Sequence, residues 1–230
     1  MNKVFGIGLT RTGTTTLVNM FKILGFNTKT HSYQLLLDWD NNNMKPLYDA
    51  VDNHTALGSI PWCLVYKEMD KKYPNSKFIL TVRNDDERWF NSQLNMSLML
   101  HPDKSNPNDI IRDRIRVAKY NRPIFKYNYP MDHKQHYLDV YHKHNDDVQK
   151  YFKGKNNLLT ICFENGDGWE EVCEFLDVDV PNVQLPHMNR TDTRIYERLH
   201  RLWRRNPDRF FGFNPDDLEI NLSELEEKYT

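Results

Sequence analysis

The sequence VFGIGLTRTGTTTL, residues 4–17, passes from a short apolar run through two glycines into a threonine-rich segment. Apolar residues then recur at helical spacing at Leu17, Met20, Phe21 and Leu24. A strand, a glycine loop and a helix in this order are typical of a phosphate-binding loop. Glycine lets the backbone turn its N–H groups toward an anion, and the following helix directs its positive dipole end there. These residues therefore predict an anion-binding site.

The cation of this loop differs from that of nucleotide triphosphatases. Gly8 and Gly13 have the spacing of the two glycines in the pattern G-x-x-x-x-G-K-[ST], but Thr14 stands where that pattern has its lysine. The cation within the loop is Arg11, which precedes the second glycine. We expect Arg11 to bind the anion together with the threonine-rich segment. The alternative interpretation is an ordinary tight turn between a strand and a helix.

Strands and helices alternate along the rest of the chain. The expected strands after the first are residues 26–30, 55–60, 77–82 and 157–163. The expected helices are residues 15–24, 33–39, 62–73, 87–100, 109–120, 133–152, 166–176 and 191–205, with irregular segments at 40–46 and 121–132. Continuous apolar runs such as KFILTV (77–82) are typical of strands buried on both faces of a parallel sheet. The pattern predicts a three-layer, P-loop-type α/β fold with a central parallel sheet flanked by helices.

Length and composition indicate one intracellular domain. The 230 residues suit a single domain over 1–230, in which 190–230 form a C-terminal helix and tail. Lys+Arg 31 against Asp+Glu 32 leaves a net charge of -1, which gives no sign of a nucleic-acid partner. No apolar run approaches the ~20 residues of a membrane span, and we expect no signal peptide. Cys63, Cys162 and Cys173 lie in apolar surroundings, so we expect reduced thiols in the cytoplasm, the host cytoplasm if the source is viral.

Two segments resemble sulfotransferases that use 3′-phosphoadenosine 5′-phosphosulfate (PAPS). Arg11 followed by the run 12–16 (TGTTT) is similar to the 5′-phosphosulfate loop of that superfamily, P-K-x-G-T-T, in which bacterial, algal and viral-type branches carry arginine. Residues 73–92, YPNSKFILTVRNDDERWFNS, are similar to the segment that binds the 3′-phosphate. There an arginine at a strand end and a serine on the next helix hold the phosphate, which implies that role for Arg83 and Ser92. The alternative for Arg83 is a surface arginine at the start of a helix.

The resemblance extends to the later part of the chain. Residues 158–189, LLTICFENGDGWEEVCEFLDVDVPNVQLPHMN, are similar to the late segment of one sulfotransferase branch, and residues 141–145 (YHKHN) with Val148 fit its long helix. The resemblance therefore covers most of the chain up to about Asn189. His187 and Asn189 belong to its Pro-His-x-Asn feature, where they either line the site or cap a loop.

The acceptor hydroxyl of such a reaction has to lose a proton, for which a neutral imidazole is suited at pH 7. His31 follows the second expected strand, at the edge of a parallel sheet where ligands bind. We expect His31 to be the general base. An ordinary loop histidine is the alternative interpretation, and His54 is the second candidate for the base.

The resemblance implies a PAPS-dependent sulfotransferase that transfers a sulfuryl group to a hydroxyl or amine of a small-molecule or saccharide acceptor. Arg11, Thr12, Gly13, Thr14, Thr15 and Thr16 would hold the 5′-phosphosulfate, with Arg83 and Ser92 on the 3′-phosphate. His31 and Arg11 would carry the chemistry, without a required metal, and adenosine 3′,5′-bisphosphate would be the product.

Two other functions stay open at this point. A P-loop kinase of a small metabolite would need the missing lysine and a strand-end aspartate for Mg²⁺, a place that Glu164 could fill. A nucleotide-binding module without a base would keep the loop but not the catalysis.

Two groups of side chains have a simple interpretation and a functional one. His133, His136, His142 and His144 indicate a solvated helix face rather than a metal site, because their spacing lacks a second ligand motif. Arg194, Arg198, Arg201 and Arg205 share one face of the expected helix 191–205. That face is either solvated or a clamp over an anionic group, and charge runs usually face water.

Overall fold

The computed structural model describes residues 2–98, 117–127, 129–130 and 132–186. The chain divides into two compact units. The first comprises Met1–Trp89 and Asp139–Asn189, and the second comprises Phe90–Leu138 and Arg190–Thr230. The first unit contains the glycine loop and all the strands described below.

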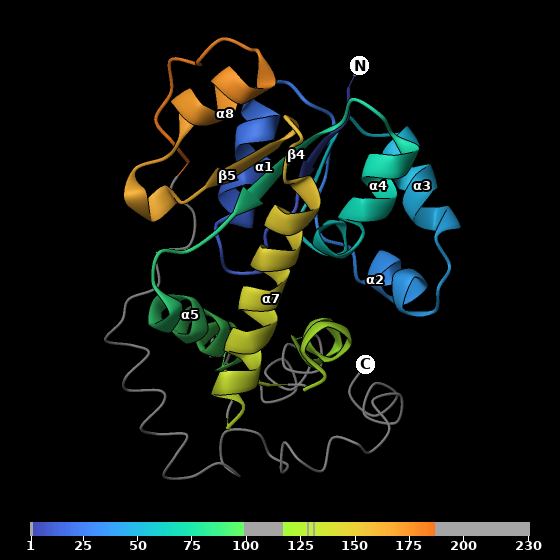
Figure 1. Cartoon of the computed structure of the whole chain (residues 1–230), viewed down its shortest axis with the longest axis vertical. Coiled ribbons are helices and arrows are strands. Elements are labelled where there is room, and N and C mark those ends of the chain that lie inside the picture. Colours follow the sequence, from blue (N-terminus) through green and yellow to red (C-terminus); the bar gives the residue numbers. More distant parts are fainter. Residues whose placement is uncertain (1, 99–116, 128, 131, 187–230) are drawn as a thin grey trace, which may run out of the picture. The chain divides into compact units, whose positions relative to one another are not determined.

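The first unit is built on a five-stranded parallel sheet with the strand order β2-β3-β1-β4-β5 (Figure 1). The strands are β1 (Val4–Gly6), β2 (Thr28–Lys29), β3 (Ala56–Gly58), β4 (Lys77–Thr81) and β5 (Leu158–Ile161). Because every pairing is parallel, the carboxyl ends of all strands lie at one edge of the sheet. The segments that follow β1 and β4 are therefore neighbours at that edge.

Helices cover both faces of this sheet. On one face α1 (Thr14–Ile23) and α8 (Trp169–Leu176) pack against alternate strand residues such as Val4 and Ile79. On the other face the intervening residues, such as Phe5 and Phe78, pack against four helices. These are α2 (Tyr33–Asp40), α3 (Lys45–Asp52), α4 (Tyr66–Lys72) and the C-terminal part of α7 (Lys134–Phe152). The predicted three-layer α/β fold with a parallel central sheet is confirmed.

Local sequence explains why α1 forms and ends where it does. Leu17, Met20 and Phe21 are buried on one face of the helix at helical spacing, which places the apolar side against the sheet. The chain leaves the helix at Gly25, whose φ of 82° lies in the left-handed region that glycine adopts without steric cost. The glycine loop is thus held between a buried strand and a buried helix.

Some element boundaries differ from those expected. Helix α3 was not among the expected helices. It begins at Lys45, inside the segment 40–46 that was predicted as irregular, and Pro46 is compatible with a first helical turn. The predicted helix 62–73 is divided at Val65 into the 3₁₀ helix η1 (Trp62–Leu64) and α4. Residues 117–125 are helical, so the prediction of irregular structure from residue 121 was wrong. The expected helix 191–205 with its four arginines, His187 and Asn189 lie outside the described residues.

The described part of the second unit is helical and aromatic. It contains most of α5 (Asp86–Leu98), the helical residues 117–125 and the first turn of α7. The rings of Phe125 and Tyr137 stack with centroids 4.2 Å apart, and the imidazole of His136 lies 2.7 Å from the Phe125 carbonyl oxygen. Ser92, on α5, is buried in this unit.

Candidate anion-binding site

Two glycines allow the loop after β1 to approach its neighbours closely. A Cβ atom at Gly8 would overlap the Thr81 hydroxyl and lie 2.5 Å from the Thr81 carbonyl oxygen. Gly13 has φ 96°, and a Cβ atom there would lie 2.5 Å from the ring of Phe163. Neither position accommodates a side chain, which explains the glycine spacing in the sequence.

A threonine contact fixes the loop on β4. The Thr12 hydroxyl donates to the Leu9 carbonyl at 2.7 Å and lies 2.6 Å from the Thr81 hydroxyl. Because a hydroxyl has one hydrogen to donate, Thr81 is the donor in the second contact. The Thr12 side chain is therefore directed into the protein and stabilises the loop.

The amino end of α1 is open to an anion. The first hydrogen bond within the helix runs from the Leu17 N–H to the Gly13 carbonyl at 3.0 Å. The N–H groups of Thr14, Thr15 and Thr16 precede it and have no carbonyl within the helix to bond. The N-cap has no side-chain hydrogen bond, and the first turn has no acidic residue. An anion would satisfy these donors and interact favourably with the helix dipole.

Two arginines lie together beside this helix end. Arg83, which follows β4, donates from Nε to the Arg11 carbonyl oxygen at 2.8 Å. Burial lowers the pKa of Arg11, and the positive charge of Arg83 lowers it further. Both effects disfavour the charged form of Arg11. A bound anion would offset both, so the arrangement favours binding of negative charge.

A carboxylate balances part of this positive charge. Glu164, in the 3₁₀ helix η2 (Phe163–Asn165), forms an ion pair with Nη1 of Arg83. Its other oxygen lies 3.4 Å from the backbone nitrogen of Asn84, and the side chains of Asn84 and Asn165 are joined at 2.8 Å. The carboxylate that a kinase would need for Mg²⁺ is thus engaged by an arginine.

Residues of helices α5 and α7 hold the glycine loop and the segment after β4 in place. The indole of Trp89 donates to the Thr10 carbonyl at 3.0 Å and stacks on Tyr141 with centroids 4.4 Å apart. The Tyr141 hydroxyl accepts the Arg83 backbone N–H at 2.9 Å. Sequence analysis assigned none of these supporting roles. The one signal that could have found Tyr141 was its place in the YHKHN run.

His144 lies in the same run and is also a supporting residue. Its Nε2 lies 2.8 Å from the Ile7 carbonyl oxygen, just before the glycine loop. Burial lowers its pKa, although the hydrogen bond to Ile7 opposes the shift. A neutral imidazole that donates from Nε2 satisfies this geometry. His144 is therefore a partly buried support of the loop, so the prediction of a solvated face was wrong for this residue, whereas His142 of the same helix is exposed.

The two candidate bases lie at opposite edges of the sheet. His31 follows β2 at the carboxyl edge, is exposed, and has Nδ1 3.4 Å from the Thr30 hydroxyl. One strand, β3, separates β2 from β1 and its loop. His54 precedes β3 at the amino edge, where its Nδ1 contacts the Ala50 carbonyl at 2.7 Å. His54 therefore lies away from the carboxyl edge that holds the glycine loop, which argues against it as the base.

The structure brings Arg83 into contact with Arg11, the residue that begins the segment 11–16 of the glycine loop. Ser92 belongs to the second unit. Among the described residues there is no group of three or more His, Cys, Asp or Glu side chains suited to a metal ion. No helix in the described part of the chain has the length and apolar character needed to cross a bilayer.

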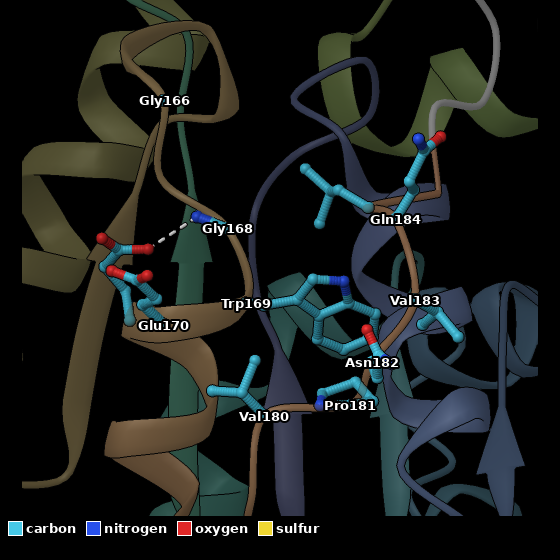
Figure 2. Close-up of a pocket in the computed structure, with 11 residues that line it drawn as sticks. Gly166, Gly168, Trp169, Glu170, Val180, Pro181, Asn182, Val183 and Gln184 are labelled. Atoms are coloured by element: carbon cyan, nitrogen blue, oxygen red, sulfur yellow. Dashed lines mark hydrogen bonds between the residues drawn. The ribbon is translucent and has the colours of Figure 1, made fainter.

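A pocket also lies beside α8, with a volume of about 660 Å³ (Figure 2). It is formed by the start of α8, where the Gly168 N–H donates to Glu171 at 2.6 Å, and by residues 180–185. Trp169 lies between these two walls. None of the predicted site residues lines this pocket.

Comparison with known proteins identifies the family. The model of the sulfotransferase domain matches residues 3–194, which include the glycine loop, Arg83 and Glu164. The chain is also similar to the Ava biosynthesis cluster protein M of Aspergillus versicolor. The two are 27% identical over an alignment of 235 positions, which covers 88% of this chain and 86% of that protein. The family match makes the chain a transferase of the sulfotransferase type, as the resemblance implied. This chain belongs to the sulfotransferase domain family.

Proposed function

We propose that this protein transfers a sulfuryl group from PAPS to a hydroxyl or amine of a small-molecule or saccharide acceptor. The observation that carries the proposal is the uncapped amino end of α1 beside Arg11 and Arg83. PAPS has two separate anionic groups, the 5′-phosphosulfate and the 3′-phosphate. Two adjacent cations and a row of backbone donors are suited to such a ligand.

The glycine loop would hold the 5′-phosphosulfate. Arg11 supplies a charge, and the N–H groups of residues 12–16 supply donors, as at other anion sites on helix ends. The Thr12 hydroxyl is used inside the protein, so Thr12 would contribute through its backbone. Arg83 would bind the 3′-phosphate through its planar guanidinium, with Ser92 as the predicted second ligand. Glycines that leave no room for a Cβ support this fit.

When bound, PAPS supplies a sulfuryl group whose sulfur bonds to the acceptor oxygen as its bond to the phosphate oxygen breaks. His31 would accept the proton that the acceptor hydroxyl loses. Arg11 and the amino end of α1 would stabilise the negative charge that develops on the departing phosphate. The acceptor would approach along the carboxyl edge of the sheet, where His31 is exposed.

No specific observation favours the kinase. Thr14 replaces the lysine of the triphosphatase loop, Arg83 stands at the strand end, and Glu164 is paired with that arginine. We therefore propose that transfer needs no metal ion. Cys63, Cys162 and Cys173 are buried free thiols, which supports a reducing compartment such as the cytoplasm.

Ligand-dependent unfolding tests the donor. Adenosine 3′,5′-bisphosphate should raise the midpoint of thermal unfolding more than AMP or ATP–Mg²⁺ at equal concentration, because ligands that bind only the folded state stabilise it. A panel of phenols, sugars and amines should then be assayed with sulfur-labelled PAPS, with and without EDTA. Stabilisation by ATP–Mg²⁺ alone, or activity that returns only with Mg²⁺, would favour the kinase. Tight bisphosphate binding with no acceptor sulfated would favour the binding module.

A further inference from the structure

We propose that Glu164 is a positioning residue that orients Arg83 for the 3′-phosphate of the donor. The proposal rests on the proposed function, because it presupposes that Arg83 contacts that phosphate. It assigns a task to a carboxylate that would otherwise oppose the binding of an anion.

Arg83 is held at three points in the ligand-free protein. Its Nε is bonded to the Arg11 carbonyl, its Nη1 to Glu164, and its backbone N–H to the Tyr141 hydroxyl. A guanidinium on a long side chain loses rotamer entropy when it is fixed. Contacts on Nε and Nη1 fix the plane of the group before a ligand arrives. The conformational entropy of the Arg83 side chain is then lost on folding and not on ligand binding.

Glu164 is itself rigidly placed. Its side chain is 19% exposed, and the backbone nitrogen of Asn84 lies 3.4 Å from its second oxygen. The residues on either side of it also contact the site. The ring of Phe163 occupies the space that a Cβ atom at Gly13 would need, and the Asn165 side chain accepts a hydrogen bond from the Asn84 side chain. The 3₁₀ helix η2 therefore contacts both the glycine loop and the Arg83 segment, and Glu164 is its charged residue.

If Glu164 acted only through its charge, its removal would have the opposite effect on bisphosphate binding. A carboxylate beside Arg83 repels a phosphate, so removing it would strengthen bisphosphate binding if electrostatics were its only effect. If Glu164 positions Arg83, removing it weakens binding of the 3′-phosphate. The two explanations thus differ in the sign of the effect.

Calorimetry on the full chain with adenosine 3′,5′-bisphosphate and AMP measures this effect. The ratio of the AMP Kd to the bisphosphate Kd isolates the contribution of the 3′-phosphate. We expect a ratio of at least about 10 in the wild type, the scale of one charge-assisted hydrogen bond. Arg83→Ala should bring the ratio close to one. Glu164→Ala should lower the ratio about tenfold and leave the Kd for AMP within about twofold, because AMP lacks the group that Arg83 would bind.

Two further variants separate positioning from charge and from folding. Glu164→Gln keeps an oxygen that accepts from Nη1, so its ratio should stay within about threefold of the wild type. Glu174→Ala removes an exposed carboxylate of α8 and should leave both affinities unchanged. Thermal unfolding of each variant checks that it is folded.

The outcomes distinguish this inference from the function on which it rests. A wild-type ratio near one overturns the assignment of Arg83 to the 3′-phosphate, and the role of Glu164 with it. A large wild-type ratio that Arg83→Ala abolishes and Glu164→Ala preserves or raises overturns the role of Glu164 alone. Equal losses of both ligands in Glu164→Ala, with Glu164→Gln equally impaired, would indicate general damage and also overturn it.

Discussion

Arg11 combines an unusual backbone conformation with a lowered pKa. Its φ of 71° lies in the left-handed region, which non-glycine residues enter at a cost of about 1–2 kcal/mol. Burial and the charge of Arg83 lower the pKa of its guanidinium. A residue held in this way favours a negatively charged partner.

Replacing Arg11 should therefore impair transfer more than binding. Arg11→Ala should lower turnover by ~10²–10³, as loss of one preorganised donor does, and weaken bisphosphate binding to a smaller extent. Turnover with labelled PAPS and calorimetry measure the two effects. Arg122→Ala, which removes an exposed arginine, is the matched control. Turnover of Arg11→Ala within about threefold of the wild type would contradict a role on the departing phosphate.

His31 separates an enzyme from a nucleotide-binding module. His31→Ala should reduce turnover by ~10²–10⁴, the range for loss of a general base, while bisphosphate affinity stays unchanged. The fall in rate on the acid side of the pH–rate profile should disappear, since it reports protonation of the base. His142→Ala, at an exposed histidine of α7, should retain the wild-type profile. If His31→Ala keeps full activity, the base lies on another residue.

At the scale of elements, the glycine loop packs closely against β4. Gly8→Ala should lower the free energy of unfolding by about 1–3 kcal/mol or more, because its Cβ meets the Thr81 hydroxyl and the backbone carbonyl. Urea unfolding measures the change. Gly168→Ala is the control, since the nearest atom would lie 3.6 Å from its Cβ. A Gly8→Ala protein as stable as Gly168→Ala would show that the loop relaxes at no cost.

At the scale of the whole molecule, long-range polar contacts make stability depend on pH. Asp70 of α4 accepts from the Tyr151 hydroxyl of α7 at 3.0 Å, from Lys155 at 2.6 Å and from Asn157, before β5, at 2.9 Å. Burial raises the pKa of Asp70, but these hydrogen bonds and the charge of Lys155 outweigh it and lower the pKa overall.

A lowered carboxyl pKa stabilises the fold above the pKa of the unfolded chain, and this contribution is lost as the pH falls through the folded pKa. Asp70→Asn should therefore lose stability at pH 7, by about 1.5–3 kcal/mol for hydrogen bonds to a charged group. The deficit should shrink as the pH falls below about 4. Urea unfolding from pH 3 to 7 measures it, with the exposed Asp146→Asn as control. A deficit that does not change with pH would contradict this assignment.

His144 also makes the protein less stable as the pH falls, but for a different reason. Because its folded pKa is lowered, the unfolded chain takes up a proton that the folded protein excludes once the pH falls below about 6.5, the ordinary value for histidine. Stability should thus fall from pH 7 to 5. His144→Gln, which keeps a donor for the Ile7 carbonyl, should flatten this part of the profile. An unchanged slope in His144→Gln would show that the imidazole is not buried in its neutral form.

Much of the fold follows from local features of the sequence. The alternation of β-rich runs with helical periodicity determined the α/β class, because each element carries its own apolar pattern. Gly8, Gly13 and the displaced cation Arg11 indicated an anion-binding loop, because backbone geometry depends on local residue type. The motif of loop and strand end also determined the family, which the sulfotransferase domain match confirms. The roles of His31, Ser92 and the donor stay predictions.

Only the tertiary structure decided which side chains meet. The strand order places β4 beside β1, so that Arg83 reaches Arg11, and the parallel direction of β3 places His54 at the amino edge. Glu164 meets Arg83 across 81 positions of sequence, and His144 meets Ile7 across 137. Such pairings depend on how crossover helices pack onto the sheet, which no local propensity specifies. The sequence by itself therefore determined the glycine loop and the family. Long-range packing selected the carboxylate of Glu164 and the ring residues, such as His144, that hold this loop and the Arg83 segment in place.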